Sequence, residues 1–380
     1  MKHEHTSERA AAPAGGDSTV AVPAAAGGGT GRRKNTGQRR GGNGTKRVEP
    51  SGAKHAAPDG LVIVDKPAGF TSHDVVAKMR GMARTRRVGH AGTLDPMATG
   101  VLVLGIERAT KLLGHLALTE KEYVGTIRLG QTTVTDDAEG EITASKAAHG
   151  IAREDIDAGI AGLSGAIMQI PSKVSAIKID GKRSYSRVRD GEDVEIPARP
   201  VTVSSFVLHS AHEAEAADGT PVTDLLVSVE CSSGTYIRAL ARDLGEGLGV
   251  GGHLTALRRT RVGPYKLDRA RTLEQLQAAV NGGAGAEGGE STGLPVMPIG
   301  DAAAAAFVRW DVTQAQARLL ANGVRIAMPL FDSTDGSDDA EGAGTGGRVG
   351  GPVAVFGPDG TFLALVENQG GKAKSLAVFV

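Results

Sequence analysis

The stretch 89–100, which reads Gly-His-Ala-Gly-Thr-Leu-Asp-Pro-Met-Ala-Thr-Gly, presents one acidic side chain in a position suited to chemistry. Asp95 lies between Gly92 and Pro96, residue types that favour tight turns, and the apolar run 101–104 follows closely. A lone carboxylate in a rigid turn can act as a nucleophile or as a base. Taken alone, the same pattern is also typical of an ordinary turn residue ahead of a proline, so its interpretation depends on the rest of the chain.

Six motifs in a fixed order resemble those of the bacterial TruB family of tRNA pseudouridine synthases. The first three are Asp-Lys-Pro-Ala-Gly-Phe-Thr-Ser at 65–72, the Asp95 loop, and Lys-Glu-Tyr at 121–123. The fourth begins with Pro-Ser-Lys-Val-Ser-Ala-Ile-Lys at 171–178 and continues through Gly181, Tyr185, Arg189 and Gly191. The last two are Gly-Thr-Tyr-Ile-Arg at 234–238 and His-Leu-Thr-Ala-Leu-Arg-Arg-Thr-Arg at 253–261. Any one of these motifs is weak evidence, but six in register are specific. The resemblance covers about 58–275.

The resemblance implies an isomerase that converts uridine to pseudouridine at position 55 in the T-loop of tRNA. This reaction breaks the bond between ribose C1′ and uracil N1, rotates the base and forms a new bond at C5, so it requires neither redox chemistry nor a metal. Asp95 would capture the sugar as an ester, attack the base, or abstract the C2′ proton, and the sequence leaves these three routes open. By resemblance, Arg238 lies beside Asp95 and favours its ionised form.

The target base lies inside a folded loop, so the enzyme must extrude it and hold it. By resemblance, Tyr123 stacks on the flipped base, Leu257 caps the pocket, and Tyr236 lies near C5 and takes its proton. His90 would fill the gap that the departing base leaves in the RNA stack. Structural alternatives are a core tyrosine for Tyr123, a helix-start tyrosine for Tyr236 and a satisfied structural histidine for His90.

Basic residues near the motifs are the expected contacts to RNA. Lys178, Lys182 and Arg189 belong to a stretch, about 165–197, that resembles the bacterial T-arm-gripping insertion. Lys66 is expected either to support the catalytic loop or to contact phosphate, and a simple strand-end lysine is an equal alternative. Further clusters that either bind phosphate or form solvated faces are Arg80, Arg84, Arg86 and Arg87; Lys173, Arg183 and Arg187; and Arg258, Arg259 and Arg261.

Composition and charge distinguish the parts of the chain that can fold from those that cannot, and they limit the possible functions. The formal net charge is zero, but the tail 1–57 carries ten Lys and Arg against four acidic residues. Because the tail is rich in Gly and Ala, it is expected to be disordered. It is either a solvated extension or a phosphate-attracting arm. The only cysteine, Cys231, lies in an apolar run and predicts a buried strand residue. Neither a signal peptide, a membrane span nor a metal-ligand spacing is found. We therefore expect a cytoplasmic monomer that needs no cofactor or protein partner and acts on tRNA.

The pattern of apolar residues predicts an α+β fold, with a mixed, largely antiparallel central sheet and flanking helices, and the resemblance implies the pseudouridine synthase fold. Ser72 is expected to cap a helix that ends at Met82. Further helices are expected at 108–118, 153–163 and 236–248, and strands at 61–64, 101–104, 123–129, 201–208 and 223–231.

The domain organisation follows from composition and resemblance. A catalytic domain spans 58–280, a Gly-rich linker 281–298, and a small β-rich domain 299–380 that by resemblance is an RNA-binding, PUA-like appendage. A helix is expected to begin at Thr313, with strands at 324–328, 353–356 and 362–366. The acidic insertion 332–351 is expected to be a disordered loop.

Two other classes of protein remain as alternatives. A guide-RNA-dependent relative would share the Asp95 loop but lack the insertion that includes Ser175, Lys178 and Tyr185, so the presence of this insertion favours the stand-alone enzyme. A protein that only binds and remodels tRNA would tolerate the loss of Asp95 and Arg238, and both are present.

Overall fold

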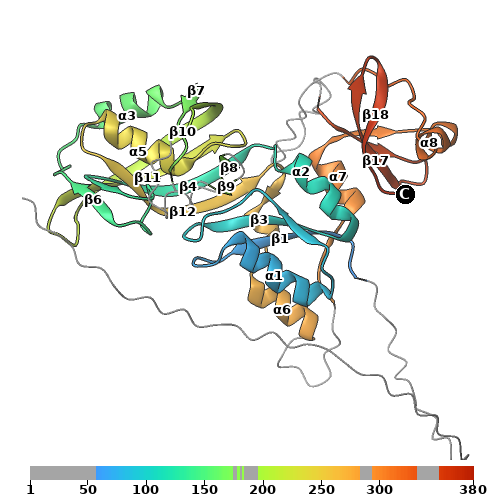
Figure 1. The fold of residues 1–380 in the computed structure, drawn as a ribbon, viewed down its shortest axis with the longest axis horizontal. Helices are drawn as coiled ribbons and strands as arrows, with labels where there is room; N and C mark the ends of the chain where they lie inside the picture. Colours follow the sequence, from blue (N-terminus) through green and yellow to red (C-terminus); the bar gives the residue numbers. More distant parts are fainter. Residues whose placement is uncertain (1–56, 174–177, 180–181, 184–195, 283–292, 332–350) are drawn as a thin grey trace, which may run out of the picture. The chain divides into compact units, whose positions relative to one another are not determined.

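The computed structural model describes residues 57–173, 178–179, 182–183, 196–282, 293–331 and 351–380. A ten-stranded sheet runs in the order β14-β1-β3-β12-β4-β11-β10-β7, with β2 beside β3 and β13 beside β12 (Figure 1). All neighbouring strands are antiparallel except β3 and β12. This confirms the predicted mixed, largely antiparallel sheet. The strands are β1 (Gly60–Lys66), β2 (Val88–Ala91), β3 (Thr99–Ile106), β4 (Lys121–Leu129), β7 (Gly165–Gln169), β10 (Arg199–Glu215), β11 (Pro221–Cys231), β12 (Gly252–Val262), β13 (Tyr265–Lys266) and β14 (Met297–Pro298).

Strand β4 shows why this sequence forms a sheet. Successive side chains of a strand point to opposite faces, and along β4 buried and half-buried residues alternate without a break. Tyr123, Ile127 and Leu129 lie on the buried face, in the largest hydrophobic cluster. Cys231, on the neighbouring strand β11, lies in the same cluster, so the prediction of a buried strand cysteine is confirmed.

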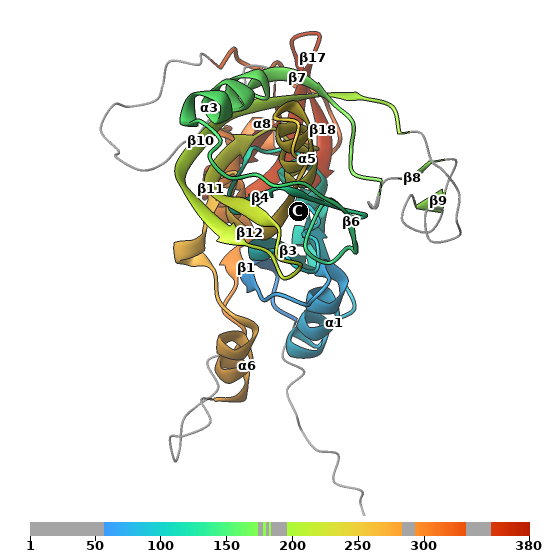
Figure 2. The ribbon, with the colours of Figure 1, turned by 90° about the vertical axis from the view of Figure 1, so that its left-hand side faces the viewer.

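Helices cover the two halves of the sheet separately. Helices α3 and α5 contact each other and the strands β10 and β12, whereas α1 and α6 contact each other and the strands β3 and β1 (Figures 1 and 2). The 3-10 segment η1 and the short helix α2 follow β3 and contact β2. The bounds are α1 (Ser72–Ala83), η1 (Glu107–Leu112), α2 (Leu113–Leu116), α3 (Arg153–Gly162), α5 (Ile237–Gly247), η2 (Leu267–Arg269), α6 (Leu273–Asn281), α7 (Ile299–Ala306) and α8 (Gln314–Ala321).

The strands β3 and β12 approach each other very closely at Gly100. Gly100 and Arg259 are partners in their short parallel pairing. Gly100 has φ +100°, and a Cβ atom there would lie 2.2 Å from the Arg259 carbonyl oxygen. Only glycine therefore fits at position 100, where β3, the strand that follows the Asp95 loop, pairs with β12.

The C-terminal residues form a second, four-stranded sheet in the order β15-β16-β17-β18. Its own hydrophobic cluster includes Trp310, Leu320 and Val355. The strands are β15 (Val308–Asp311), β16 (Val353–Phe356), β17 (Phe362–Gln369) and β18 (Lys372–Val378). A β-rich C-terminal domain is thus confirmed, whereas its likeness to a PUA domain stays a prediction. The small two-stranded sheets pair β5 (Gln131–Thr133) with β6 (Ile142–Ser145) and β8 (Lys178–Ile179) with β9 (Lys182–Arg183).

Three local predictions differ from the structure. The helix expected at 108–118 is split into η1 and α2, and the strand expected at 324–328 is reduced to one isolated bridge between Ala327 and Lys372. Thr71, not Ser72, caps α1, because the Thr71 side chain accepts a hydrogen bond from the Asp74 N–H. Ser72 has another role, at the site.

The domain boundaries stay predictions, and parts of them lie outside the described residues. The tail 1–57 and the acidic insertion 332–351 are described only at their last residues, 57 and 351. Of the linker 281–298, residues 281–282 and 293–298 are described, and its last two residues form β14, which pairs with β1.

Candidate active site

Asp95 and Arg238 form an ion pair between the loop that joins β2 to β3 and the first turn of α5. Arg238 Nε lies 3.0 Å from Asp95 Oδ2, and Arg238 Nη2 donates to Asp95 Oδ1 at 3.2 Å. The Arg238 side chain is 5% exposed and that of Asp95 is 36% exposed. A guanidinium that contacts both carboxylate oxygens fixes their orientation. The predicted pair is therefore assembled, with its carboxylate accessible from outside.

A second carboxylate, Asp137, holds the same guanidinium from the other side. Arg238 Nη1 lies 3.3 Å from Asp137 Oδ2 and donates to the Thr135 carbonyl at 2.8 Å. The Asp137 side chain is only 3% exposed. Asp137 was not predicted from the sequence, because a short acidic run after a strand is an ordinary turn signal and its spacing does not relate it to Arg238. Buried between two carboxylates, the guanidinium has little freedom to leave Asp95.

Tyr236 immediately precedes α5, at its N-cap position. Its backbone is held by the side-chain amide of Gln169, which accepts from the Tyr236 N–H at 2.8 Å and donates to the Tyr236 carbonyl at 3.1 Å. Gln169 is buried at the end of β7. Gln169, which was not predicted from the sequence, therefore fixes the start of the helix at which Tyr236 and Arg238 lie.

The Asp95 loop is braced from β1 and from α1. Lys66 Nζ donates to the carbonyls of Pro67, Phe70 and Pro96 at 2.9, 2.6 and 3.1 Å. Ser72 Oγ accepts from the Leu94 N–H at 2.9 Å and donates to the Leu94 carbonyl at 3.2 Å. Lys66 is fully buried, so supporting the loop fits its position and contact with phosphate does not.

Arg259 braces the loop from β12. It is 1% exposed and donates to the carbonyls of Val101, Thr93 and Gly92 at 2.8, 3.2 and 3.1 Å. Arg259 is the cross-strand neighbour of Tyr123 in the pair β4–β12. From the sequence, Arg259 was predicted as one of several possible phosphate contacts. The structure instead gives it an internal role, because it ties the catalytic loop to β12.

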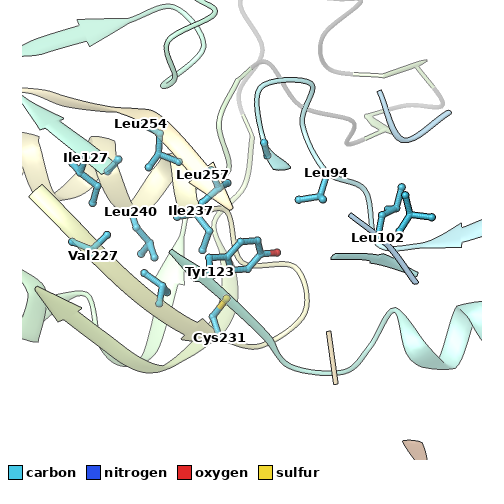
Figure 3. Packing of buried hydrophobic residues seen from close by; sticks show 14 of the residues in the cluster. Leu94, Leu102, Tyr123, Ile127, Val227, Cys231, Ile237, Leu240, Leu254 and Leu257 are labelled. Atoms are coloured by element: carbon cyan, nitrogen blue, oxygen red, sulfur yellow. The ribbon is translucent and has the colours of Figure 1, made fainter. Parts of the chain in front are cut away.

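Tyr123 and Leu257 lie side by side, each 7% exposed. Figure 3 shows the Tyr123 ring close to Leu257, Ile237 and Cys231, with its hydroxyl directed toward the side on which Leu94 lies. Burial raises the pKa of the Tyr123 phenol. The ring is therefore a neutral apolar surface, consistent with both the stacking role and the alternative of a core tyrosine.

His90 lies on β2, five residues before Asp95, and is half-buried. Its ring meets that of His73 from α1 edge to face, with 5.6 Å between centroids. Burial, followed by the charge of His73, lowers the pKa of His90. A mostly neutral, partly apolar ring suits contact with a base more than contact with a phosphate.

The predicted RNA contacts of the insertion are only partly described. Lys178 and Lys182 lie on the paired strands β8 and β9, whereas Tyr185 and Arg189 fall outside the described residues. Of the last basic cluster, Arg258 pairs with Asp65 and Arg261 pairs with Glu122 and Glu230. These two arginines are thus neutralised within the protein.

In the part of the chain that the structure describes, no cluster of His, Cys, Asp and Glu side chains could hold a metal ion. No helix in that part is both long enough and apolar enough to cross a membrane.

Buried lysines around the loop predict a dependence of stability on pH. Lys121 is 6% exposed, its Nζ donates to the Ala117 and Thr119 carbonyls, and burial lowers its pKa to about 8. Burial also lowers the pKa of Lys66 to about 8. Between the folded value and the ordinary 10.5, the unfolded chain binds more protons, so the free energy of unfolding rises with pH. We expect a rise of roughly 1–3 kcal/mol between pH 7 and 10 in urea titrations followed by circular dichroism.

Lys121→Met should show a smaller rise, because one of the two groups is removed. Lys111→Met, which changes an exposed lysine, is the matched control and should keep the wild-type rise. Equal pH dependence in Lys121→Met and the wild type would contradict the role of Lys121.

Comparison with protein families gives matches over most of the chain. Residues 80–237 match the N-terminal domain of the TruB family of pseudouridylate synthases. Residues 238–287 match the C-terminal domain of tRNA pseudouridylate synthase B, and 307–380 match the C-terminal domain of tRNA pseudouridine synthase II.

Individual relatives agree with these matches. A protein of Streptomyces griseus named tRNA pseudouridine synthase B is 70% identical over 85% of this chain and 97% of its own length. A protein of the same name from Thermobifida fusca is 51% identical over 84% of this chain and 98% of its own. A chain in the crystal structure of a Cbf5-Nop10-Gar1 complex is similar in fold, with a TM-score of 0.59, 24% identity and 86% coverage of both chains.

Proposed function

Because the chain belongs to the TruB family of pseudouridylate synthases, we propose that it isomerises uridine to pseudouridine at position 55, in the T-loop of tRNA. The observation that carries this proposal is the accessible carboxylate of Asp95, which lies on a braced loop and pairs with the buried Arg238. The relatives at 70% identity, which are named for tRNA, support the class of substrate.

The residues of the site match what the reaction demands. The bond from N1 to C1′ breaks, the uracil turns, C5 bonds to C1′, and the C5 proton leaves while N1 gains one, so substrate and product are isomers. Asp95 acts at the sugar or at the base, and Arg238 holds its carboxylate in place. Tyr236, at the start of the same helix as Arg238, takes the C5 proton.

The extruded base is held by apolar side chains. Tyr123 supplies a flat neutral ring and Leu257 lies beside it, so the pair offers a stacking surface that any uridine can use. His90, on β2 just before the loop that carries Asp95, fills the vacated place in the RNA stack. Lys178, Lys182 and Arg189 contact the backbone of the T-arm.

An isolated T-arm stem-loop is expected to be modified at a rate within about tenfold of whole tRNA, because one hairpin supplies both the grip and the extruded base. The measurement is pseudouridine mapping at single-nucleotide resolution after incubation with the purified chain. A stem-loop with cytidine at the target position is the matched control and should yield no product. A requirement for added guide RNA would overturn the proposal in favour of the guide-dependent class.

We further propose that the enzyme acts in the cytoplasm as a monomer and needs no other protein. Sedimentation of the chain with and without the stem-loop tests this, since a one-to-one complex is expected, and a dimer that is required for activity would contradict it.

A further inference from the structure

The side chain of Gln169, the last residue of the edge strand β7, bonds to the backbone on both sides of the Tyr236 Cα atom. Its Oε1 accepts from the Tyr236 N–H at 2.8 Å, and its Nε2 donates to the Tyr236 carbonyl at 3.1 Å. The pairing has one orientation only, because an N–H must meet the amide oxygen and a carbonyl must meet the amide nitrogen. Gln169 is 1% exposed, so water competes little for its amide.

Tyr236 lies at the junction between a turn and a helix. The turn that precedes it contains Gly234, which has φ +90°, and α5 begins at the next residue, Ile237. Its carbonyl also accepts the first backbone bond of α5, from the Leu240 N–H at 3.2 Å. The first N–H groups of a helix have no acceptor within the helix, and Gln169 supplies one for Tyr236. The brace from β7 therefore acts where the helix itself gives the backbone least support.

A second contact joins the same end of β7 to α5. Arg242, one helical turn after Arg238, donates from Nη2 to the Ile170 carbonyl at 2.7 Å. On its other side, Gln169 pairs with Arg199 of β10. The end of β7 is thus held by both β10 and α5, so the side chain of Gln169 extends from a fixed backbone toward Tyr236.

We propose that Gln169 is a positioning residue for pseudouridine formation, which holds Tyr236 where its hydroxyl can reach C5 of the extruded base. The inference rests on the proposed function, in which Tyr236 takes the C5 proton. Gln169 acts through the Tyr236 backbone, with which its amide is engaged. Because the two bonds lie on either side of the Cα atom, they set the direction in which the tyrosine side chain leaves the backbone. A displacement of about 1 Å at a reacting group lowers a rate about a hundredfold, so losing the brace has a measurable effect.

The test begins with Gln169→Met in the full chain. Methionine has nearly the same length and volume as glutamine but offers neither the donor nor the acceptor. Single-turnover rates are measured at saturating enzyme with the T-arm stem-loop, between pH 5.5 and pH 8.5. We expect the rate to fall about tenfold or more at every pH, with affinity for the stem-loop within about threefold of the wild type.

Gln169→Glu tests whether both bonds are needed. A protonated carboxyl group has one donor and one acceptor, as the amide has, whereas the ionised form only accepts and repels the Tyr236 carbonyl. Burial beside this carbonyl raises the pKa of a carboxyl group at position 169. Arg199 is exposed, and Arg238 and Arg242 are paired with carboxylates, so their opposite effect is smaller. The rate relative to wild type should be within about threefold at pH 5.5 and fall toward that of Gln169→Met by pH 8.5.

Gln131→Met is the matched control. Gln131 is also a buried glutamine, 2% exposed, and its Nε2 donates to Ser145 Oγ at 3.3 Å and to Asp218 Oδ2 at 3.1 Å. Its variant loses side-chain hydrogen bonds of the same kind, but none to α5, and should keep the wild-type rate. Thermal unfolding of each variant shows whether the fold is retained, and Gln169→Glu remains informative if Gln169→Met unfolds.

Three results would overturn the inference: a wild-type rate for Gln169→Met, an equal loss in Gln131→Met, or a relative rate of Gln169→Glu that does not change with pH. Asp95→Asn, assayed alongside, separates this inference from the function on which it rests. An inactive Asp95→Asn beside a fully active Gln169→Met would reject the role of Gln169 alone, whereas an active Asp95→Asn would reject the proposed function itself.

Discussion

Asp95→Asn is expected to abolish pseudouridine formation, with a loss of at least about a thousandfold, while tRNA affinity stays within about tenfold of the wild type. An asparagine has nearly the same shape but cannot form the ester, attack the base or accept the C2′ proton, so all three routes that are open to Asp95 are lost. Binding survives because phosphate contacts and base stacking supply most of its free energy. Single-turnover product formation and filter binding on the same preparation measure the two quantities.

The matched control for this substitution is Asp224→Asn. Asp224, on β11, also forms a two-point ion pair with an arginine, Arg128 on β4, at 2.8 and 2.7 Å, and neither residue belongs to the loop. Its variant should keep the wild-type rate. Turnover near the wild-type rate in Asp95→Asn would remove Asp95 from the mechanism.

Arg238→Met is expected to impair both activity and stability. The rate should fall at least about a hundredfold, because Asp95 loses the group that orients its carboxylate. The free energy of unfolding should fall by about 3–5 kcal/mol, because Asp137, with 3% of its side chain exposed, is left as a buried carboxylate without its guanidinium. Urea titration and single-turnover assays measure the two effects.

Two further variants separate these effects. Arg242→Met, one helical turn later, removes pairs with Asp136 and Asp243 that are more exposed, so its losses should be smaller. Arg238→Met combined with Asp137→Asn should recover part of the stability, since no buried charge is left unpaired, but none of the activity. Recovery of activity in the double variant would show that Arg238 serves only the fold.

The sequence alone identified the side chains whose types the chemistry requires. Asp95, Arg238 and Tyr123 lie in short motifs whose residue types and order are specific, so the family and the reaction were recognisable without coordinates, and the ion pair predicted between Asp95 and Arg238 is present in the structure. The largely antiparallel sheet was also predictable, because alternation of buried and exposed residues, as in β4, is a local property of a strand.

The tertiary structure decided which residues hold these side chains in place. Arg238 lies 143 residues from Asp95, and Asp137, Gln169 and Arg259 reach the site from three different strands or turns. Their types were unremarkable in the sequence, since an acidic turn, a glutamine and one of several clustered arginines each fit a solvated surface equally well. Their roles depend on long-range packing that buries them beside the loop, where the backbone carbonyls and the guanidinium need partners, and a local pattern carries no information about such distant partners.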